Sequence, residues 1–235
     1  YDVSWLEQVL RKDYLPELTE LPSYRRVVKD ILLGFSPKHR FDVQCWSDPK
    51  PGFVDISEII KKNWKRISEK TSEKIFLYRQ SKKVKGEGFR KILNDAQQIL
   101  FVCYGNINRS ALAEHIFNKM NTSNGLQCSS AGFHVNEGRT ADPSMVEIAR
   151  ESDLDLSCHR SQKITIKMLA KSDIIFVMEK KHHDNIIKHY GKMYNIYLLG
   201  SFLENHSCEI MDPYGHPTST YRKVSIDIWK SVDSL

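Results

Sequence analysis

Residues 98–114 read QILFVCYGNINRSALAE, and this stretch decides the fold. It opens with four consecutive apolar residues, 99–102, which are typical of a strand buried inside a parallel sheet. Cys103 follows, and a loop containing Gly105 leads to Arg109 and Ser110, where a helical pattern begins. The stretch therefore predicts a strand, a tight loop of the form Cys-x5-Arg-Ser, and a helix.

The same alternation continues through the rest of the chain. Two further apolar runs, 173–178 and 196–199, and a more polar one at 126–131 predict three more strands. Helical patterns lie between and after these runs, at 111–121, 143–152, 166–170, 181–190 and 218–232. Strands that alternate with helices predict an α/β protein with a parallel sheet.

The first 94 residues have a different character. Helix-spaced apolar residues occupy 3–12, 22–33 and about 55–79, and the stretch SKKVKGEG at 81–88 is predicted to be a linker. Residues 1–95 hold 20 Lys and Arg against 14 Asp and Glu, so they carry the whole net charge of +6. We therefore expect a basic, mainly helical segment over 1–94 and a separate domain over 95–235.

The basic excess is interpreted as a solvated helix face and linker, with a ligand-binding patch as the alternative. Aromatic residues are not interleaved with the basic ones as stacking on bases requires, so no nucleic-acid partner is expected.

No run of about 18 apolar residues occurs, which predicts no membrane-spanning helix. The N-terminus shows no signal peptide and lacks Met, so we expect a trimmed or partial chain. Five scattered cysteines make no disulfide framework, and the cytoplasm is the expected compartment.

The Cys-x5-Arg-Ser loop carries the chemistry. Backbone N–H groups of such a loop and the positive end of the following helix favour an anion, and they stabilise the thiolate of Cys103. Arg109 can bind two phosphate oxygens with its planar fork, and Gly105 permits the turn. The Ser110 hydroxyl can donate to the sulfur. Asp212, in a loop before the last predicted helix, is a candidate general acid.

Together these features resemble the low-molecular-weight protein tyrosine phosphatase family over about 98–235. Four blocks carry the resemblance in order: 99–114, 129–132, 155–161 and 212–215. The resemblance implies a three-layer sandwich, in which a four-stranded parallel sheet has helices on both faces, with the helical N-terminal segment in front.

The resemblance also implies a role for each matching residue. Cys103 attacks phosphorus to form a cysteinyl-phosphate, Arg109 binds the phosphoryl oxygens, and Asp212 serves as general acid and then as base. Phosphate binding and loop support fall to Tyr104, Gly105, Asn106, Ile107, Asn108, Ser110, Ser130 and His159. The substrate rim falls to Tyr104, Phe133 and Tyr214. His159 is expected to be structural, and no metal or cofactor is expected.

Two residues depart from the family pattern, and three other functions stay open. Asn108 stands where most members have a second Cys, and Phe133 stands where Thr is common. An arsenate reductase of this fold would need closely paired resolving cysteines, which the chain lacks. A protein arginine phosphatase typically has Thr at the position of Ile107. A catalytically silent phosphopeptide-binding module is the third alternative.

The resemblance implies a phosphotyrosine protein as substrate, with a bacterial tyrosine kinase of exopolysaccharide export as a candidate. The N-terminal segment is not assigned by this resemblance. Residues 41–60 faintly resemble the tail of ATP-grasp ligase-like proteins. Docking of a partner is the alternative function for the segment.

Overall fold

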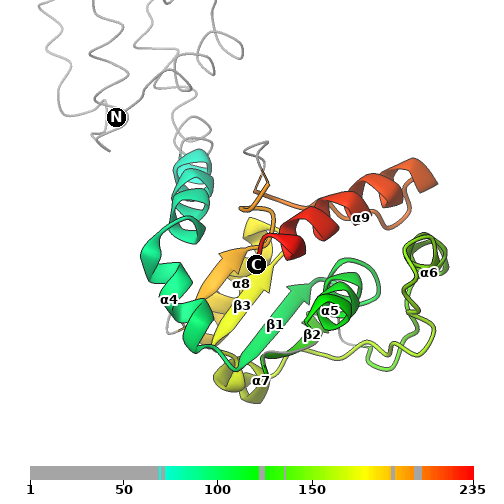
Figure 1. The fold of residues 1–235 in the computed structure, drawn as a ribbon, viewed down its shortest axis with the longest axis horizontal. Coiled ribbons are helices and arrows are strands. Elements are labelled where there is room, and N and C mark those ends of the chain that lie inside the picture. Colours follow the sequence, from blue (N-terminus) through cyan, green and yellow to red (C-terminus); the bar gives the residue numbers. More distant parts are fainter. Residues whose placement is uncertain (1–68, 70–71, 122–124, 135, 192–193, 204–207) are drawn as a thin grey trace, which may run out of the picture. The chain divides into compact units, whose positions relative to one another are not determined.

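The computed structural model describes residues 69, 72–121, 125–134, 136–191, 194–203 and 208–235 (Figure 1). The helices expected at 3–12 and 22–33, most of that expected at 55–79, and the resemblance at 41–60 lie outside these residues. The chain divides between Phe76 and Leu77, and the unit Leu77–Leu235 carries the sheet. None of the helices in the described ranges has the length and apolar character needed to cross a membrane.

Four parallel strands form the sheet in the order β2-β1-β3-β4. Their bounds are Gln98–Cys103 (β1), Gln127–Gly132 (β2), Ile174–Val177 (β3) and Ile196–Leu198 (β4). All four predicted strands are confirmed, including the polar one that became β2. The strand β2 can be more polar than its neighbours because it lies at an edge of the sheet.

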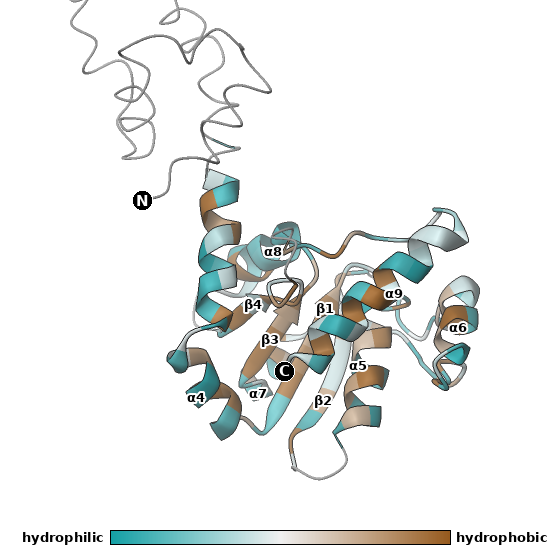
Figure 2. Cartoon of the chain, turned by 45° about the horizontal axis from the view of Figure 1, so that its top comes forward, coloured by the Kyte–Doolittle hydropathy of each residue, from teal (hydrophilic) through white to brown (hydrophobic). Residues whose placement is uncertain are grey.

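Both faces of the sheet are buried, which explains the uninterrupted apolar runs. In β1, Ile99, Phe101 and Cys103 belong to the large core on one face, while Leu100 and Val102 are buried on the other. Figure 2 shows these hydrophobic strands at the centre of the unit. Parallel strands need helical crossovers, and helices on both faces exclude water from both sides.

The helices provide the two outer layers. Their bounds are Glu87–Asp95 (α4), Arg109–Met120 (α5), Pro143–Arg150 (α6), Ile166–Lys171 (α7), Lys180–Tyr190 (α8) and Thr218–Asp233 (α9). Helices α4, α5 and α9 contribute to the core around Phe101, and α5 packs along α9. Helices α7 and α8 pack on the opposite face of the sheet (Figure 1). The predicted three-layer α/β sandwich is confirmed.

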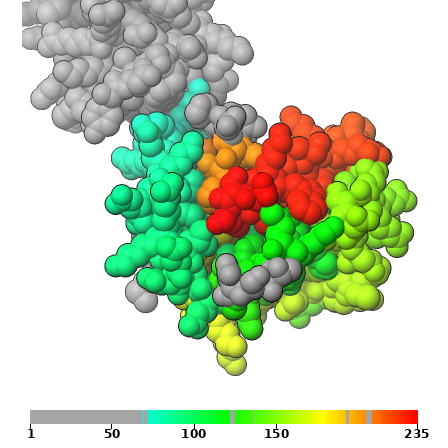
Figure 3. Space-filling view, in the orientation of Figure 1, coloured from blue at the N-terminus to red at the C-terminus, as the bar shows by residue number. Residues whose placement is uncertain are grey.

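The linker predicted at 81–88 is wrong. Helical residues 72–84 are followed by a break at 85–86, and α4 begins at once. Val84 and Phe89 are buried in the core, and the Phe89 ring lies 4.9 Å from the Tyr197 ring and 5.7 Å from that of Phe202. Figure 3 shows this blue-green segment directly against the orange residues that follow β4. The stretch 81–88 has three lysines, two glycines and a single apolar residue, Val84, so its composition resembles that of a linker.

Removing the Phe89 ring should destabilise the protein strongly. Phe89 is 5% exposed, so Phe89→Ala leaves a cavity between α4 and the sheet. We expect the free energy of unfolding to fall by about 3–5 kcal/mol, measured by urea titration. The control is Tyr78→Ala, whose side chain is 62% exposed and whose loss should cost below about 0.5 kcal/mol. Equal losses in both variants would show that α4 does not stabilise the core.

Candidate active site

The Cys-x5-Arg loop lies where the sheet topology creates a site. It joins the carboxyl end of β1 to α5, and β1 has β2 on one side and β3 on the other. The chain connections leave these neighbouring strands in opposite directions, which opens a crevice outside their carboxyl ends. Cys103 ends β1, and Glu179 follows β3 closely, so both lie at this edge.

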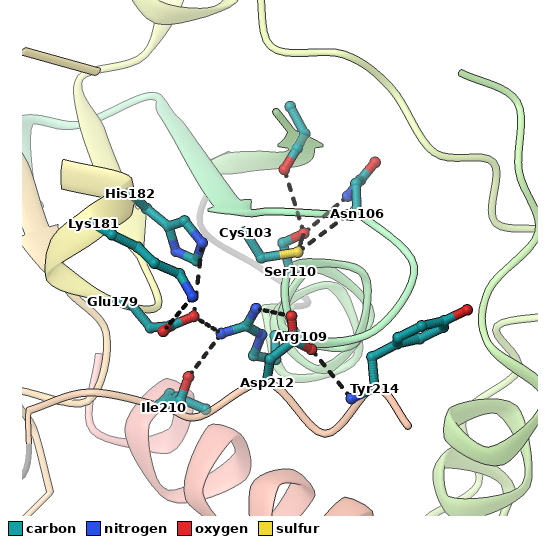
Figure 4. Close-up of polar contacts among 12 residues, drawn as sticks. Cys103, Asn106, Arg109, Ser110, Glu179, Lys181, His182, Ile210, Asp212 and Tyr214 are labelled. Atoms are coloured by element: carbon teal, nitrogen blue, oxygen red, sulfur yellow. Dashed lines mark hydrogen bonds and ion pairs between the residues drawn. The ribbon is translucent and has the colours of Figure 1, made fainter. Parts of the chain in front are cut away.

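The sulfur of Cys103 has two hydrogen-bonding partners. The Asn106 backbone N–H donates to Sγ at 3.2 Å, and the Ser110 Oγ lies 3.0 Å from it (Figure 4). Helix α5 starts at Arg109, so the positive end of its dipole also faces the loop. A thiolate only accepts hydrogen bonds, so it would receive one from the Asn106 N–H and one from the Ser110 hydroxyl, and the helix N-terminus would stabilise the same nucleophilic form of cysteine.

Asn106 holds the loop in its curled shape. Its φ of 52° is a left-handed conformation that side chains disfavour, so surrounding contacts must maintain it. Its Nδ2 donates to Ser110 Oγ at 2.9 Å and to Ser130 Oγ at 2.7 Å. Its Oδ1 accepts from the Gln162 N–H, and its carbonyl accepts from His159 Nε2, both at 2.8 Å. The structure thus brings together four residues of the predicted polar network.

His159 contacts the loop backbone, at the carbonyl of Asn106. Burial lowers the pKa of its imidazole, although the Asn106 carbonyl and Glu114 act in the opposite direction. A neutral ring keeps one N–H for the Asn106 carbonyl. This placement supports a positioning role for His159.

Sequence reasoning missed three residues that support the loop. Ser130 Oγ donates to Glu114 Oε2 at 2.5 Å, and Arg139 Nη2 donates to the Gly105 carbonyl at 2.7 Å. A Cβ on Gly132 would lie 2.6 Å from the Tyr104 carbonyl oxygen, so only glycine fits there. Glu114 and Gly132 stood inside the blocks that carried the resemblance, whereas no local pattern distinguished Arg139.

Arg109 is almost fully buried, with 1% of its side chain exposed, and it is held by three acceptors. Its Nη1 donates to Glu179 Oε1 at 2.5 Å and to the Ile210 carbonyl at 2.9 Å, and its Nη2 donates to Asp212 Oδ2 at 2.6 Å (Figure 4). Its Nε is buried and has no partner among the described residues. The fork is therefore oriented by fixed contacts, with one buried donor left for a ligand.

Glu179 is a site residue that the sequence placed only in the turn after a core strand. Burial raises the pKa of Glu179, but hydrogen bonds from Arg109 and Lys181 outweigh this and hold the pKa below its ordinary value. His182 packs nearby, and burial together with the Arg109 charge lowers its pKa to about 3. Glu179 is therefore the anion that fixes the buried guanidinium.

The rim of the site is aromatic. The side chains of Tyr104 and Tyr214 are 52% and 65% exposed, while Ile107 is buried. The Tyr214 N–H donates to Asp212 Oδ1 at 3.3 Å, so the same loop presents both the carboxylate and the ring. Phe133 is half-buried, and its ring stacks on His182 at 5.7 Å.

The loop holds a single thiol. Asn108, at the position where the resemblance implies a second Cys, is buried, and its Oδ1 has no partner in the described part of the chain. Cys103, Cys128, Cys158 and Cys208 are all free thiols.

A parallel α/β sheet with a Cys-x5-Arg loop at its carboxyl edge is the architecture of a cysteine-dependent phosphatase. Residues 98–235 match the family described as low molecular weight phosphotyrosine protein phosphatase. The chain therefore belongs to this family, and it is a protein tyrosine phosphatase by enzyme class.

Individual relatives agree with the family, and they include both tyrosine phosphatases and an arginine phosphatase. The low molecular weight protein-tyrosine-phosphatase Wzb of Escherichia coli K12 is 33% identical over 54% of this chain and 84% of its own length. The solved structure of the tyrosine phosphatase AmsI of Erwinia amylovora matches with a TM-score of 0.55 and 29% identity, over 59% of this chain and 90% of that one. The arginine phosphatase YwlE of Geobacillus stearothermophilus matches with a TM-score of 0.54 and 26% identity, over 59% and 89%.

Proposed function

We propose that the chain hydrolyses phosphotyrosine in two steps, with Cys103, Arg109 and Asp212 as the catalytic residues. The Cys103 thiolate attacks phosphorus while Asp212 gives a proton to the leaving phenolate oxygen, which forms a cysteinyl-phosphate. Asp212 then takes a proton from a water molecule that attacks phosphorus and releases phosphate and the thiolate. The observation that carries this proposal is that Arg109 of the Cys103 loop contacts Asp212 directly, although Asp212 lies far along the chain.

The contacts of Arg109 suggest how substrate enters. Nε and Nη2 lie on one edge of the guanidinium, so they form the fork that a phosphoryl group can bind with two oxygens. Nε has no partner in the described ranges, and Nη2 is held by Asp212. A bound phosphoryl group would take Nη2 from Asp212 and leave the carboxylate beside the leaving oxygen. Glu179 keeps Nη1 throughout and so preserves the orientation of the fork.

The remaining predicted site residues have supporting roles in this proposal. Asn106, Ser110, Ser130 and His159 hold the loop and the sulfur, and Gly105, Ile107 and Asn108 form its backbone. Tyr104 and Tyr214 receive the aromatic ring of the substrate, and Phe133, stacked on His182, completes the rim. No step requires a metal or a cofactor.

The experiment that tests substrate choice compares phosphotyrosine and phosphoarginine peptides of the same sequence. We expect phosphotyrosine to be hydrolysed with a kcat/KM at least about tenfold higher, because Ile107 and the tyrosine rim suit an aromatic ester. In the matched variant Ile107→Thr, the ratio of kcat/KM for the phosphotyrosine peptide to that for the phosphoarginine peptide should be smaller. Faster release of phosphate from phosphoarginine would favour the arginine phosphatase, and binding of phosphotyrosine without release would favour the silent module. Thiol-coupled reduction of arsenate would favour the reductase.

For the physiological setting we propose a protein substrate in the cytoplasm, with a bacterial tyrosine kinase as the candidate. The family resemblance supports this choice.

The phosphatase domain is proposed to span 95–235, with residues 77–94 packed onto it. The basic residues before it are proposed to dock a partner.

A further inference from the structure

Two histidines and a glutamate meet behind the phosphate-binding loop. Glu114 and His115 come from α5, and His159 comes from the segment after α6. Each offers a ligand atom, and these atoms all lie within 4.8 Å of one another. The two imidazole rings have centroids 5.7 Å apart and an interplanar angle of 68°. Two imidazole nitrogens and a carboxylate oxygen are a donor set that Zn²⁺ takes in proteins.

The hydrogen bonds of both histidines prepare them as ligands. His159 Nε2 lies 2.8 Å from the Asn106 carbonyl, and His115 Nδ1 lies 2.8 Å from the Ala111 carbonyl. A carbonyl only accepts, so each of these nitrogens carries the hydrogen, and the lone pairs remain on His159 Nδ1 and His115 Nε2. Zinc-binding histidines typically donate their second nitrogen to a carbonyl or carboxylate in this way.

The carboxylate and the accessibility of the cluster also fit. Glu114 Oε2 accepts from Ser130, which leaves Oε1 for an ion. A neutral imidazole is the form of histidine that binds a metal ion. Glu114 and His115 are only half-buried, so an ion can reach the cluster.

We propose that Glu114, His115 and His159 bind one Zn²⁺ ion at a site distinct from the Cys103 centre. Two of its ligands also hold the phosphate-binding loop, because His159 binds the Asn106 carbonyl and Glu114 binds Ser130. The ion would therefore brace the contacts that keep Asn106 in its left-handed conformation. The proposed Zn²⁺ site is independent of the proposed phosphotyrosine substrate, because it rests only on the positions of the three ligand side chains.

The test measures Zn²⁺ binding to the full chain by calorimetry in metal-free buffer. We expect one equivalent to bind and to raise the melting temperature, because an ion that binds only the folded state stabilises it. His115→Gln should weaken Zn²⁺ binding by at least about tenfold. The matched control His189→Gln changes an exposed histidine on α8 and should leave the affinity unchanged. Both variants should keep the metal-free activity, which also shows that they fold.

A second measurement identifies the ligands without any substitution. Co²⁺ bound by nitrogen and oxygen gives visible absorption without the thiolate charge-transfer band that cysteine ligands produce. Cys128 is a neighbouring thiol, since its Sγ lies 3.6 Å from the Glu114 carbonyl oxygen, so a thiolate band would reveal cysteine as a ligand. Mg²⁺ should not displace Co²⁺, since it prefers oxygen ligands. Equal Zn²⁺ affinity in His115→Gln and the unsubstituted chain, or a thiolate band with Co²⁺, would overturn the proposal.

Discussion

Replacing Cys103 with serine should abolish turnover of p-nitrophenyl phosphate and of phosphotyrosine peptides. Serine fits the same volume, but a hydroxyl is a far weaker acid and nucleophile than a thiol. The contacts from the Asn106 N–H and Ser110 Oγ stabilise an anion that serine does not form. We expect kcat to fall by at least about 10⁴-fold, as for removal of other enzymic nucleophiles.

The Cys103→Ser protein should keep its fold, so that a loss of turnover reports on the nucleophile and not on unfolding. Cys103 is 2% exposed and contributes little volume that serine lacks. Circular dichroism and the urea midpoint should therefore change little, and the variant should still bind phosphotyrosine through Arg109. The control Cys158→Ser changes an exposed thiol and should leave turnover unaltered. A Cys103→Ser protein with measurable turnover would disprove the cysteinyl-phosphate mechanism.

Replacing Asp212 with alanine should slow phosphotyrosine hydrolysis by about 10²–10⁴-fold, the usual contribution of a general acid. The loss of activity should depend on the leaving group, because only a leaving oxygen that needs a proton requires the general acid. The variant should therefore lose less with p-nitrophenyl phosphate, whose leaving group is a stable anion, than with a phosphotyrosine peptide. Steady-state kinetics over a series of aryl phosphates measures this difference.

The ion pair between Asp212 and Arg109 adds a second expectation. Asp212 holds Nη2 of the fork in the free enzyme, so its removal leaves that donor open to phosphate. We expect phosphate to inhibit the variant more strongly than the unsubstituted protein, even as kcat falls. Asp184→Ala, which removes an exposed carboxylate that pairs with Lys180 on α8, is the control and should change neither quantity. A uniform loss across all leaving groups would argue against Asp212 as the acid.

The sequence predicted most of the fold correctly because both faces of the sheet are buried. Apolar runs at 99–102 and 173–178 allow few other structures, and the helices between them follow from the parallel arrangement. The prediction failed at 81–88, where local composition indicated a linker. Burial of Val84, and of Phe89 just after the stretch, is decided by the core that they join, and a single apolar residue among lysines gives no periodic signal.

The active site likewise contains residues that the sequence could predict and residues that it could not. The Cys103 loop could be predicted because strand, loop and helix are adjacent in sequence, so that short-range geometry places Arg109 and Ser110 near the sulfur. Glu179, Arg139 and the metal-binding cluster could not, since their partners come from other elements and their distances depend on packing.

The sequence by itself determined that this chain forms a parallel α/β phosphatase domain with its nucleophile on the first strand. Its local pattern suffices for that, because the strand, the Cys-x5-Arg loop and the helix form one continuous unit. Only the tertiary structure decided which groups surround that loop. The order of the strands brings Glu179 and Asp212 to Arg109, and the packing of α5 against the segment after α6 brings Glu114 and His115 to His159. These contacts join residues far apart in the chain, so no local pattern could specify them.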